Sequence, residues 1–209
     1  RWQPDLVLLT GDVSEDGSAA SYGRVSAQLS TVGAPVLALP GNHDDPAVMR
    51  RYFPLGPWGR PYVCEKRNWQ LVLLDSTEPD RVAGEFSDAA LAELEQCLLN
   101  ASSRHVLIAL HHQPVLVGSL WIDRYALDRA DGFWSVVDRF SQVRCVAWGH
   151  VHQDFHALRS EVALPGSPST VANSLPGRET FTLDTGGPAV RWLELGVDGT
   201  LETGLLRTL

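Results

Sequence analysis

Short apolar runs recur along the chain and alternate with amphipathic stretches. The apolar runs are residues 5–9, 34–39, 70–74, 106–110 and 143–148. Apolar runs of this length are typical of strands that are covered on both faces. The amphipathic stretches, which we expect to be helices, are residues 18–29, 46–51, 87–99 and 133–140. Strands that alternate with helices predict an α/β fold containing a parallel sheet.

Two helix starts carry additional signals. Ser18 is a residue type that caps helices, and Asp45 followed by Pro46 is typical of a cap and a first helical residue. The chain changes character after residue 160. Short runs separated by turn signals lie at residues 161–164, 180–183, 190–195 and 201–206. They predict an antiparallel sheet that completes a single domain over residues 1–209.

The composition is that of an ordinary globular domain, with 44% hydrophobic and 20% charged residues in a chain of 209. The net charge of -8 argues against a nucleic-acid partner, which requires a basic face. No apolar run approaches the roughly 20 residues that span a bilayer, so we expect no membrane partner. Three scattered cysteines favour the cytoplasm over a disulfide framework. The oligomeric state, monomer or dimer, stays open.

Metal-ligand residue types follow four of the predicted strands. They form the motifs Gly11-Asp12, Gly41-Asn-His-Asp44, His111-His112 and Gly149-His-Val-His152. Each motif alone has an ordinary explanation, because Asp and Asn are common in turns and caps. Together they lie where the carboxyl ends of strands meet in an α/β sheet. The constellation therefore predicts a metal site.

The residue types also restrict the metal. Mixed carboxylate, amide and imidazole ligands suit manganese, iron or zinc better than calcium. Two such ions close together form a clamp for phosphate esters, and a water on such an ion becomes hydroxide near neutral pH. The motifs therefore indicate a metal-dependent phosphoesterase.

The four motifs, in this order and at these separations, resemble the calcineurin-like metallophosphoesterase superfamily. Longer segments resemble its bacterial class III cyclic AMP phosphodiesterases, namely Gly11-Asp-Val-Ser-Glu-Asp16, His111-His-Gln-Pro114, Trp121-Ile-Asp-Arg-Tyr125 and Phe181-Thr-Leu-Asp-Thr185. The resemblance covers essentially the whole chain. It implies a four-layer sandwich in which two mixed β-sheets are flanked by helices.

The resemblance also implies roles for single residues. Asp12 would bridge two metal ions, His152 would bind the first ion, and Asn42, His111 and His150 would complete the shell of the second. Asn42 would also contact substrate.

Two catalytic roles follow from the same resemblance. His43 would contact the phosphate and protonate the leaving oxygen, and Asp44 would orient His43.

The roles of two further residues are less fixed. Spacing does not decide whether His111 or His112 is the ligand, because adjacent side chains point to opposite sides of a strand. The family pattern favours His111, which leaves His112 to pack or to meet substrate. Trp121 follows in the next loop, where its face could stack on a purine ring.

One family motif is missing. The superfamily begins with a strand that ends in Asp-x-His, and no such motif precedes Asp12. A βαβ unit does not fit into the 11 residues before Asp12. We therefore expect the sequence to lack the first strand and helix, about 40–60 residues, and to bind the first metal poorly.

The resemblance implies hydrolysis of 3′,5′-cyclic AMP to 5′-AMP by metal-bound hydroxide, with a small cyclic nucleotide as the partner. Two alternatives stay open. One is a phosphodiesterase for a glycerophosphodiester or for a broad range of substrates. The other is a non-catalytic metal-binding or regulatory relative, which only the missing Asp-x-His favours.

Overall fold

The computed structural model describes residues 3–54, 61–101 and 104–207. In chain order these residues form β1 (Val7–Thr10), α1 (Ala19–Leu29), a 3₁₀ helix (Ser30–Val32), β2 (Val36–Leu39), α2 (Pro46–Met49), β3 (Tyr62–Lys66), β4 (Trp69–Leu73), α3 (Asp88–Asn100), β5 (His105–Leu110), α4 (Leu120–Asp123), α5 (Ala130–Val137), β6 (Val143–Trp148), β7 (Phe155–Arg159), β8 (Val162–Gly166), β9 (Ala189–Leu195) and β10 (Leu201–Arg207). The strands and helices predicted up to residue 148 are all present, with their ends shifted by a few residues.

The strands form one large mixed sheet and two strand pairs. The six-stranded sheet has the order β3-β4-β5-β6-β8-β7. In it β4, β5, β6 and β8 are parallel, and the edge strands β3 and β7 are antiparallel to their neighbours. β1 and β2 form a parallel pair, and β9 and β10 form an antiparallel pair. The parallel strands set the edge at which the predicted motifs lie.

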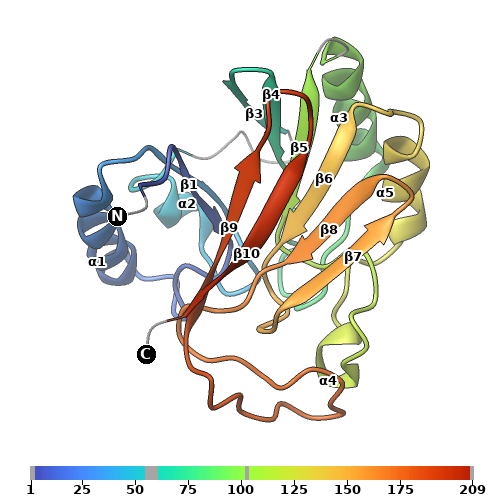
Figure 1. The fold of residues 1–209 in the computed structure, drawn as a ribbon. Coiled ribbons are helices and arrows are strands. Elements are labelled where there is room, and N and C mark those ends of the chain that lie inside the picture. The colour runs from blue at the N-terminus through green and yellow to red at the C-terminus, as the bar shows by residue number, and fades with distance from the viewer. Residues whose placement is uncertain (1–2, 55–60, 102–103, 208–209) are drawn as a thin grey trace.

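Clusters of buried hydrophobic residues lie between four layers of helices and sheets. Leu107 and Ala109 of β5 pack with residues of β1, β2, β9 and β10 on one face of the six-stranded sheet. Ile108 points the other way and packs with α3 and α5, as the period of two in a strand requires. Tyr22 of α1 and Met49 of α2 cover the outer face of β2. The order helix, sheet, sheet, helix confirms the predicted architecture (Figure 1).

Both predicted caps are confirmed. Ser18 Oγ accepts a hydrogen bond from the N–H of Ser21 at 3.2 Å at the start of α1. Asp45 Oδ1 accepts from the N–H groups of Ala47 and Val48, at 2.8 and 3.1 Å, and Pro46 opens α2. Each cap satisfies backbone donors that the first helical turn leaves unpaired.

The prediction for the end of the chain was only partly right. β9 and β10 do pair antiparallel, but β8 joins the six-stranded sheet beside β6. Residues 180–183 are not a strand, because their only pairing among the described residues is the bridge between Ser174 and Leu183. β3 and β7 were missed. In β7 the apolar residue Leu158 is exposed, so the strand does not show the usual alternation of buried apolar and exposed polar residues.

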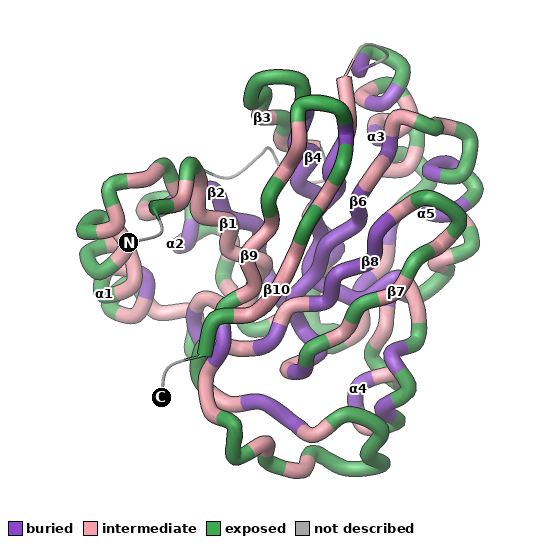
Figure 2. Tube along the Cα trace, in the orientation of Figure 1, coloured by how far each residue is buried: buried purple, intermediate pink, exposed green. Residues whose placement is uncertain are grey.

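Burial follows these layers. Figure 2 shows the central strands mostly buried, whereas most of residues 167–188, which we call the β8–β9 loop, are exposed or intermediate. Within the described part of the chain, no helix is long and apolar enough to cross a membrane.

Candidate metal centre

Three of the predicted metal ligands lie close to one nitrogen atom of a fourth, His111. His111 Nε2 lies 3.2 Å from Asp12 Oδ2, 3.2 Å from Asn42 Oδ1 and 3.1 Å from His150 Nδ1. Each of these residues follows the carboxyl end of a different strand: β1 for Asp12, β2 for Asn42, β5 for His111 and β6 for His150. The parallel strands therefore deliver four ligand groups to one edge of the sheets.

The hydrogen bond on the other side of the His111 ring fixes its tautomer. His111 Nδ1 lies 2.7 Å from the carbonyl oxygen of Thr10, and a carbonyl only accepts, so Nδ1 carries the proton. Nε2 then faces the oxygens of Asp12 and Asn42. Burial lowers the pKa of His111, but the charge of Asp12 and the hydrogen bonds to Asp12 and Thr10 together raise it above its ordinary value. A second ring proton or a metal cation must supply the positive charge that these groups require. The donor set fits a metal ion of the predicted kind.

The charges around this point agree with such a site. Burial raises the pKa of Asp12, but attraction to His111, the hydrogen bond to His111 and the hydrogen bond from the N–H of His43 together outweigh burial, so this pKa lies well below its ordinary value. Burial lowers the pKa of His150 and of His152, with the neighbouring His111 adding to the effect. Both rings are therefore neutral at physiological pH, which is the form that binds metals. His150 Nε2 is also buried without a hydrogen-bond partner in the described residues.

His152 lies beside this group rather than inside it. Its Nδ1 donates to the carbonyl oxygen of Ala172 at 2.9 Å, which leaves the lone pair on Nε2. A backbone carbonyl behind the ring is the usual support of a metal-binding histidine. The ring also contacts Trp121 edge to face, with 6.4 Å between the ring centroids.

The ring of His112 is close to the site but turned away from it. His112 has a nitrogen within 4.8 Å of nitrogens of His111 and His150. However, its Nε2 donates to the carbonyl oxygen of Val82 at 2.9 Å, and its Nδ1 contacts Ser76 Oγ at 2.8 Å. The residue is fully buried, and burial lowers its pKa to about 3. These contacts give the predicted substrate role of His112 no support and indicate a structural role.

Asp44 contacts other groups than the one we expected. Its carboxylate accepts from the N–H groups of Gly41, Val13 and Ser14 at 2.9, 3.2 and 3.0 Å, and from the hydroxyl of Tyr22 at 3.0 Å. These bonds join the loop after β1 to the loop after β2. They do not support the predicted role of Asp44 in orienting His43. They indicate instead that Asp44 connects the two loops that carry Asp12 and Asn42.

His43 lies at the rim of the site. Its backbone N–H donates to Asp12 Oδ1 at 3.1 Å, which fixes its position. The side chain remains 43% exposed, and its Nδ1 lies 3.5 Å from Glu15 Oε1. Nothing in the sequence indicated that Glu15 would contact a residue 28 positions away. The ring of His43 is therefore open to solvent.

The backbone at the site is strained. Asp12, His150 and His152 have positive φ angles of 52°, 60° and 47°. Residues with a Cβ adopt this conformation at a cost, and such residues cluster at functional sites. Gly41 is required for a different reason. A Cβ there would lie 2.5 Å from the backbone nitrogen of Asp12 and would overlap its Oδ1 atom.

Trp121 in α4 is partly buried, and its Nε1 has no hydrogen-bond partner in the described residues. The supporting groups that sequence reasoning missed are the carbonyls of Thr10 and Ala172 and the hydroxyl of Ser76. Every residue has a carbonyl, so the sequence offered no signal for the first two. Ser76 follows a predicted strand at the same edge, and that position was the available signal for it.

Comparison with known proteins gives an independent assignment. Residues 1–154 match the family described as calcineurin-like phosphoesterase. The chain is 40% identical over 209 residues to the 3′,5′-cyclic adenosine monophosphate phosphodiesterase CpdA of Pseudomonas aeruginosa, a match that covers 99% of this chain and 76% of that protein. It is 38% identical over 207 residues to a 3′,5′-cyclic-nucleotide phosphodiesterase of Nostoc sp., covering 99% and 78%.

A solved structure supports the fold alone. A dimetal phosphatase from Danio rerio aligns with a TM-score of 0.66 at 16% identity, over 78% of this chain and 72% of that one. The sequence match over most of the chain, rather than this likeness, assigns the family. The chain belongs to the calcineurin-like phosphoesterase family and is a metal-dependent hydrolase of phosphate esters.

Proposed function

We propose that this chain hydrolyses 3′,5′-cyclic AMP to 5′-AMP. The observation that carries the proposal is the meeting of Asp12, Asn42 and His150 around Nε2 of His111. A relative that is 40% identical over 99% of the chain is named as a phosphodiesterase for this nucleotide, which supports the substrate.

The ligand set would be divided between two ions. Asp12, Asn42, His111 and His150 would hold one, and Asp12 with His152 would contribute to the other. Manganese, iron and zinc all suit these donors. When bound, the ions supply positive charge for the phosphate oxygens and lower the pKa of water.

The protein's own groups position and protonate the substrate. His43 has an exposed ring at the rim of the ligand cluster, where it would donate a hydrogen bond to a phosphate oxygen and a proton to the leaving 3′ oxygen. The carbonyls of Thr10 and Ala172 hold the protons of His111 and His152 on Nδ1, so that both rings present Nε2. Asn42, at the same edge, would also contact the substrate.

The remaining expectations stay predictions. They are a cytoplasmic location, a single domain over residues 1–209, and the absence of nucleic-acid and membrane partners.

The test compares turnover of cyclic AMP with turnover of bis(p-nitrophenyl) phosphate in the presence of Mn²⁺. Asn42→Ala is the test variant, and His156→Ala, at an exposed position in β7, is the control. Hydrolysis of cyclic AMP that the test variant loses and the control keeps is the expected result. Hydrolysis of the artificial diester alone would move the substrate to another phosphodiester. Mn²⁺ binding without hydrolysis of either would indicate a non-catalytic relative.

A further inference from the structure

An aromatic cluster that includes one ring open to solvent borders the candidate metal centre. The rings of Trp121 and Phe181 meet edge to face with 5.2 Å between centroids, and His152 lies 6.4 and 6.5 Å from them. Trp121 also packs against the main hydrophobic core. Phe181, by contrast, is 45% exposed. The cluster therefore places an exposed apolar ring beside a candidate metal ligand.

The position of Phe181 is fixed by the fold of the β8–β9 loop. The N–H of Ser174 donates to the carbonyl oxygen of His152 at 2.7 Å. The N–H of Thr182, next to Phe181, donates to Ser174 Oγ at 3.0 Å. Ser174 thus joins the loop to His152 through one hydrogen bond. A second hydrogen bond, within the loop, lies next to Phe181.

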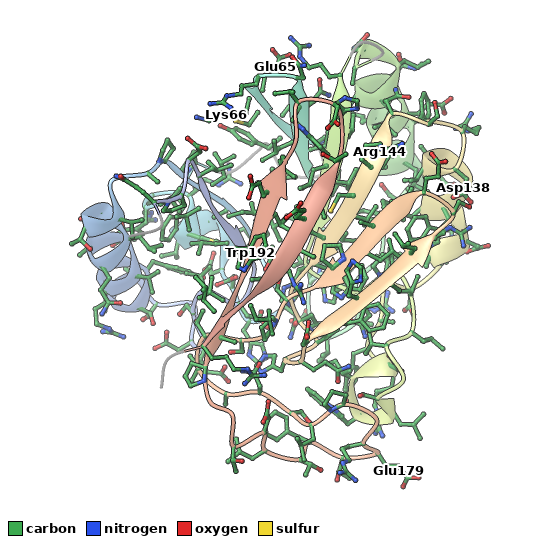
Figure 3. The ribbon with its side chains drawn as sticks, viewed as in Figure 1. Glu65, Lys66, Asp138, Arg144, Glu179 and Trp192 are labelled. Atoms are coloured by element: carbon green, nitrogen blue, oxygen red, sulfur yellow. The ribbon has the colours of Figure 1, made fainter. Side chains whose placement is uncertain are left out.

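A second contact holds the far bend of the loop against α4. The N–H of Gly177 donates to Ser119 Oγ at 2.9 Å, and Ser119 is the residue that precedes α4. Figure 3 shows Glu179 on this outer bend, beside α4 and directed away from the sheets. The loop therefore runs from the metal centre to α4 and carries Phe181 between two anchors. A ring held in this way loses little conformational entropy when a ligand stacks on it.

Trp121 supports Phe181 from the side of the protein core. Trp121 Nε1 is buried and has no hydrogen-bond acceptor among the described residues. Packing of its ring against Phe181 and against the main hydrophobic core therefore holds Trp121 in the cluster.

We propose that the exposed ring of Phe181 stacks on the heteroaromatic base of the nucleotide substrate, with Trp121 as its rigid support. The proposal rests on the proposed function, which places the phosphate of the substrate at the ligand cluster next to His152. Stacking of a base on an aromatic side chain tolerates any base, because every base has a π face. Phe181 would then separate nucleotides from aliphatic phosphodiesters without selecting among the bases.

The experiment measures what the base contributes to binding. Calorimetry of the Mn²⁺-loaded protein compares 5′-AMP with ribose 5-phosphate, which carries the same phosphate and sugar but no base. The variants are Phe181→Ala, Phe181→Trp as the conservative replacement, and Leu183→Ala as a control at another exposed apolar position of the loop. We expect Phe181→Ala to weaken 5′-AMP about 5- to 150-fold and to leave ribose 5-phosphate unchanged. Phe181→Trp and Leu183→Ala should retain both affinities.

Three results would overturn the proposal. They are equal affinity of the unmodified protein for both ligands, an equal loss for both in Phe181→Ala, and no loss for either. The KM for cyclic AMP should rise in parallel with the loss of 5′-AMP affinity, with little change in kcat. Failure of the proposed function would be seen separately, as no hydrolysis of cyclic AMP by the unmodified protein.

Discussion

The ring of His111 is bonded through Nδ1 to the carbonyl oxygen of Thr10 at 2.7 Å, although the two residues are 101 positions apart. The bond joins the end of β5 to the end of β1, which belong to different layers of the fold. It fixes the proton on Nδ1 and turns Nε2 toward Asp12 and Asn42. This contact between layers, together with the contacts of His112 with Ser76 and Val82, places His111 rather than His112 at the ligand cluster.

The two adjacent histidines should therefore respond differently to substitution. We expect His111→Ala to lower Mn²⁺ affinity by at least about 100-fold, because the ring lies at the centre of the donor set. His112→Ala should retain Mn²⁺ binding and lose at least about 1–3 kcal/mol of stability, since Ser76 and Val82 lose their partner. Titration calorimetry and urea unfolding measure the two effects. Loss of Mn²⁺ binding by a folded His112→Ala variant would contradict this assignment.

Removal of metal should destabilise the protein. Asp12, Asn42, His111 and His150 are close together only in the folded state, so an ion at 100 times its Kd adds about 2.7 kcal/mol to the free energy of unfolding. Chelation should lower the Tm, and added Mn²⁺ should restore it. Asn42→Ala should reduce this shift, whereas His156→Ala should keep it. An unchanged Tm on chelation would contradict binding of metal to the folded protein, and an equal Tm shift in Asn42→Ala and His156→Ala would argue that the ions bind outside this cluster.

Gly41 should be intolerant of any side chain. A Cβ would lie 2.5 Å from the backbone nitrogen of Asp12 and 2.7 Å from His111 Cε1, so Gly41→Ala must displace both ligands. We expect metal affinity or activity to fall about 10- to 100-fold. Gly23→Ala in α1 is the matched control, because its Cβ would meet only a Tyr52 ring atom at an ordinary 3.5 Å. That control should be neutral or stabilising by up to about 1 kcal/mol. Similar activity of the two variants would show that the loops can separate freely.

The hydrogen bonds around Asp44, which connect the loops after β1 and β2, should contribute measurably to stability. Tyr22→Phe removes the hydroxyl that donates to Asp44 at 3.0 Å and accepts from the N–H of Asp45 at 2.8 Å. We expect a loss of about 0.5–1.5 kcal/mol in urea unfolding, since the ring itself stays packed. Tyr125→Phe, at an exposed ring, should change stability by less. If both variants unfold alike, the hydroxyl of Tyr22 does not stabilise the loops.

The errors in the sequence-based predictions have identifiable causes. We predicted a strand at residues 180–183, but the β8–β9 loop bends to α4. In the part of the chain that the structure describes, a single bridge is then the only strand-like pairing of these residues. β7 escaped notice because Leu158, an apolar residue, lies 68% exposed on an edge strand. In both cases the neighbours of a segment, rather than its own residues, decided its state.

The sequence by itself determined the layers and the edge that carries the site. Strands covered on both faces must be apolar throughout, and parallel strands bring Asp12, Asn42, His111 and His150 to one edge wherever they end. Only the tertiary structure decided the rest: that His111 faces the cluster and His112 does not, that Asp44 ties two loops, and that Phe181 lies beside His152. These outcomes depend on contacts between residues 29 to 101 positions apart, many of them through backbone groups, and such groups carry no sequence signature.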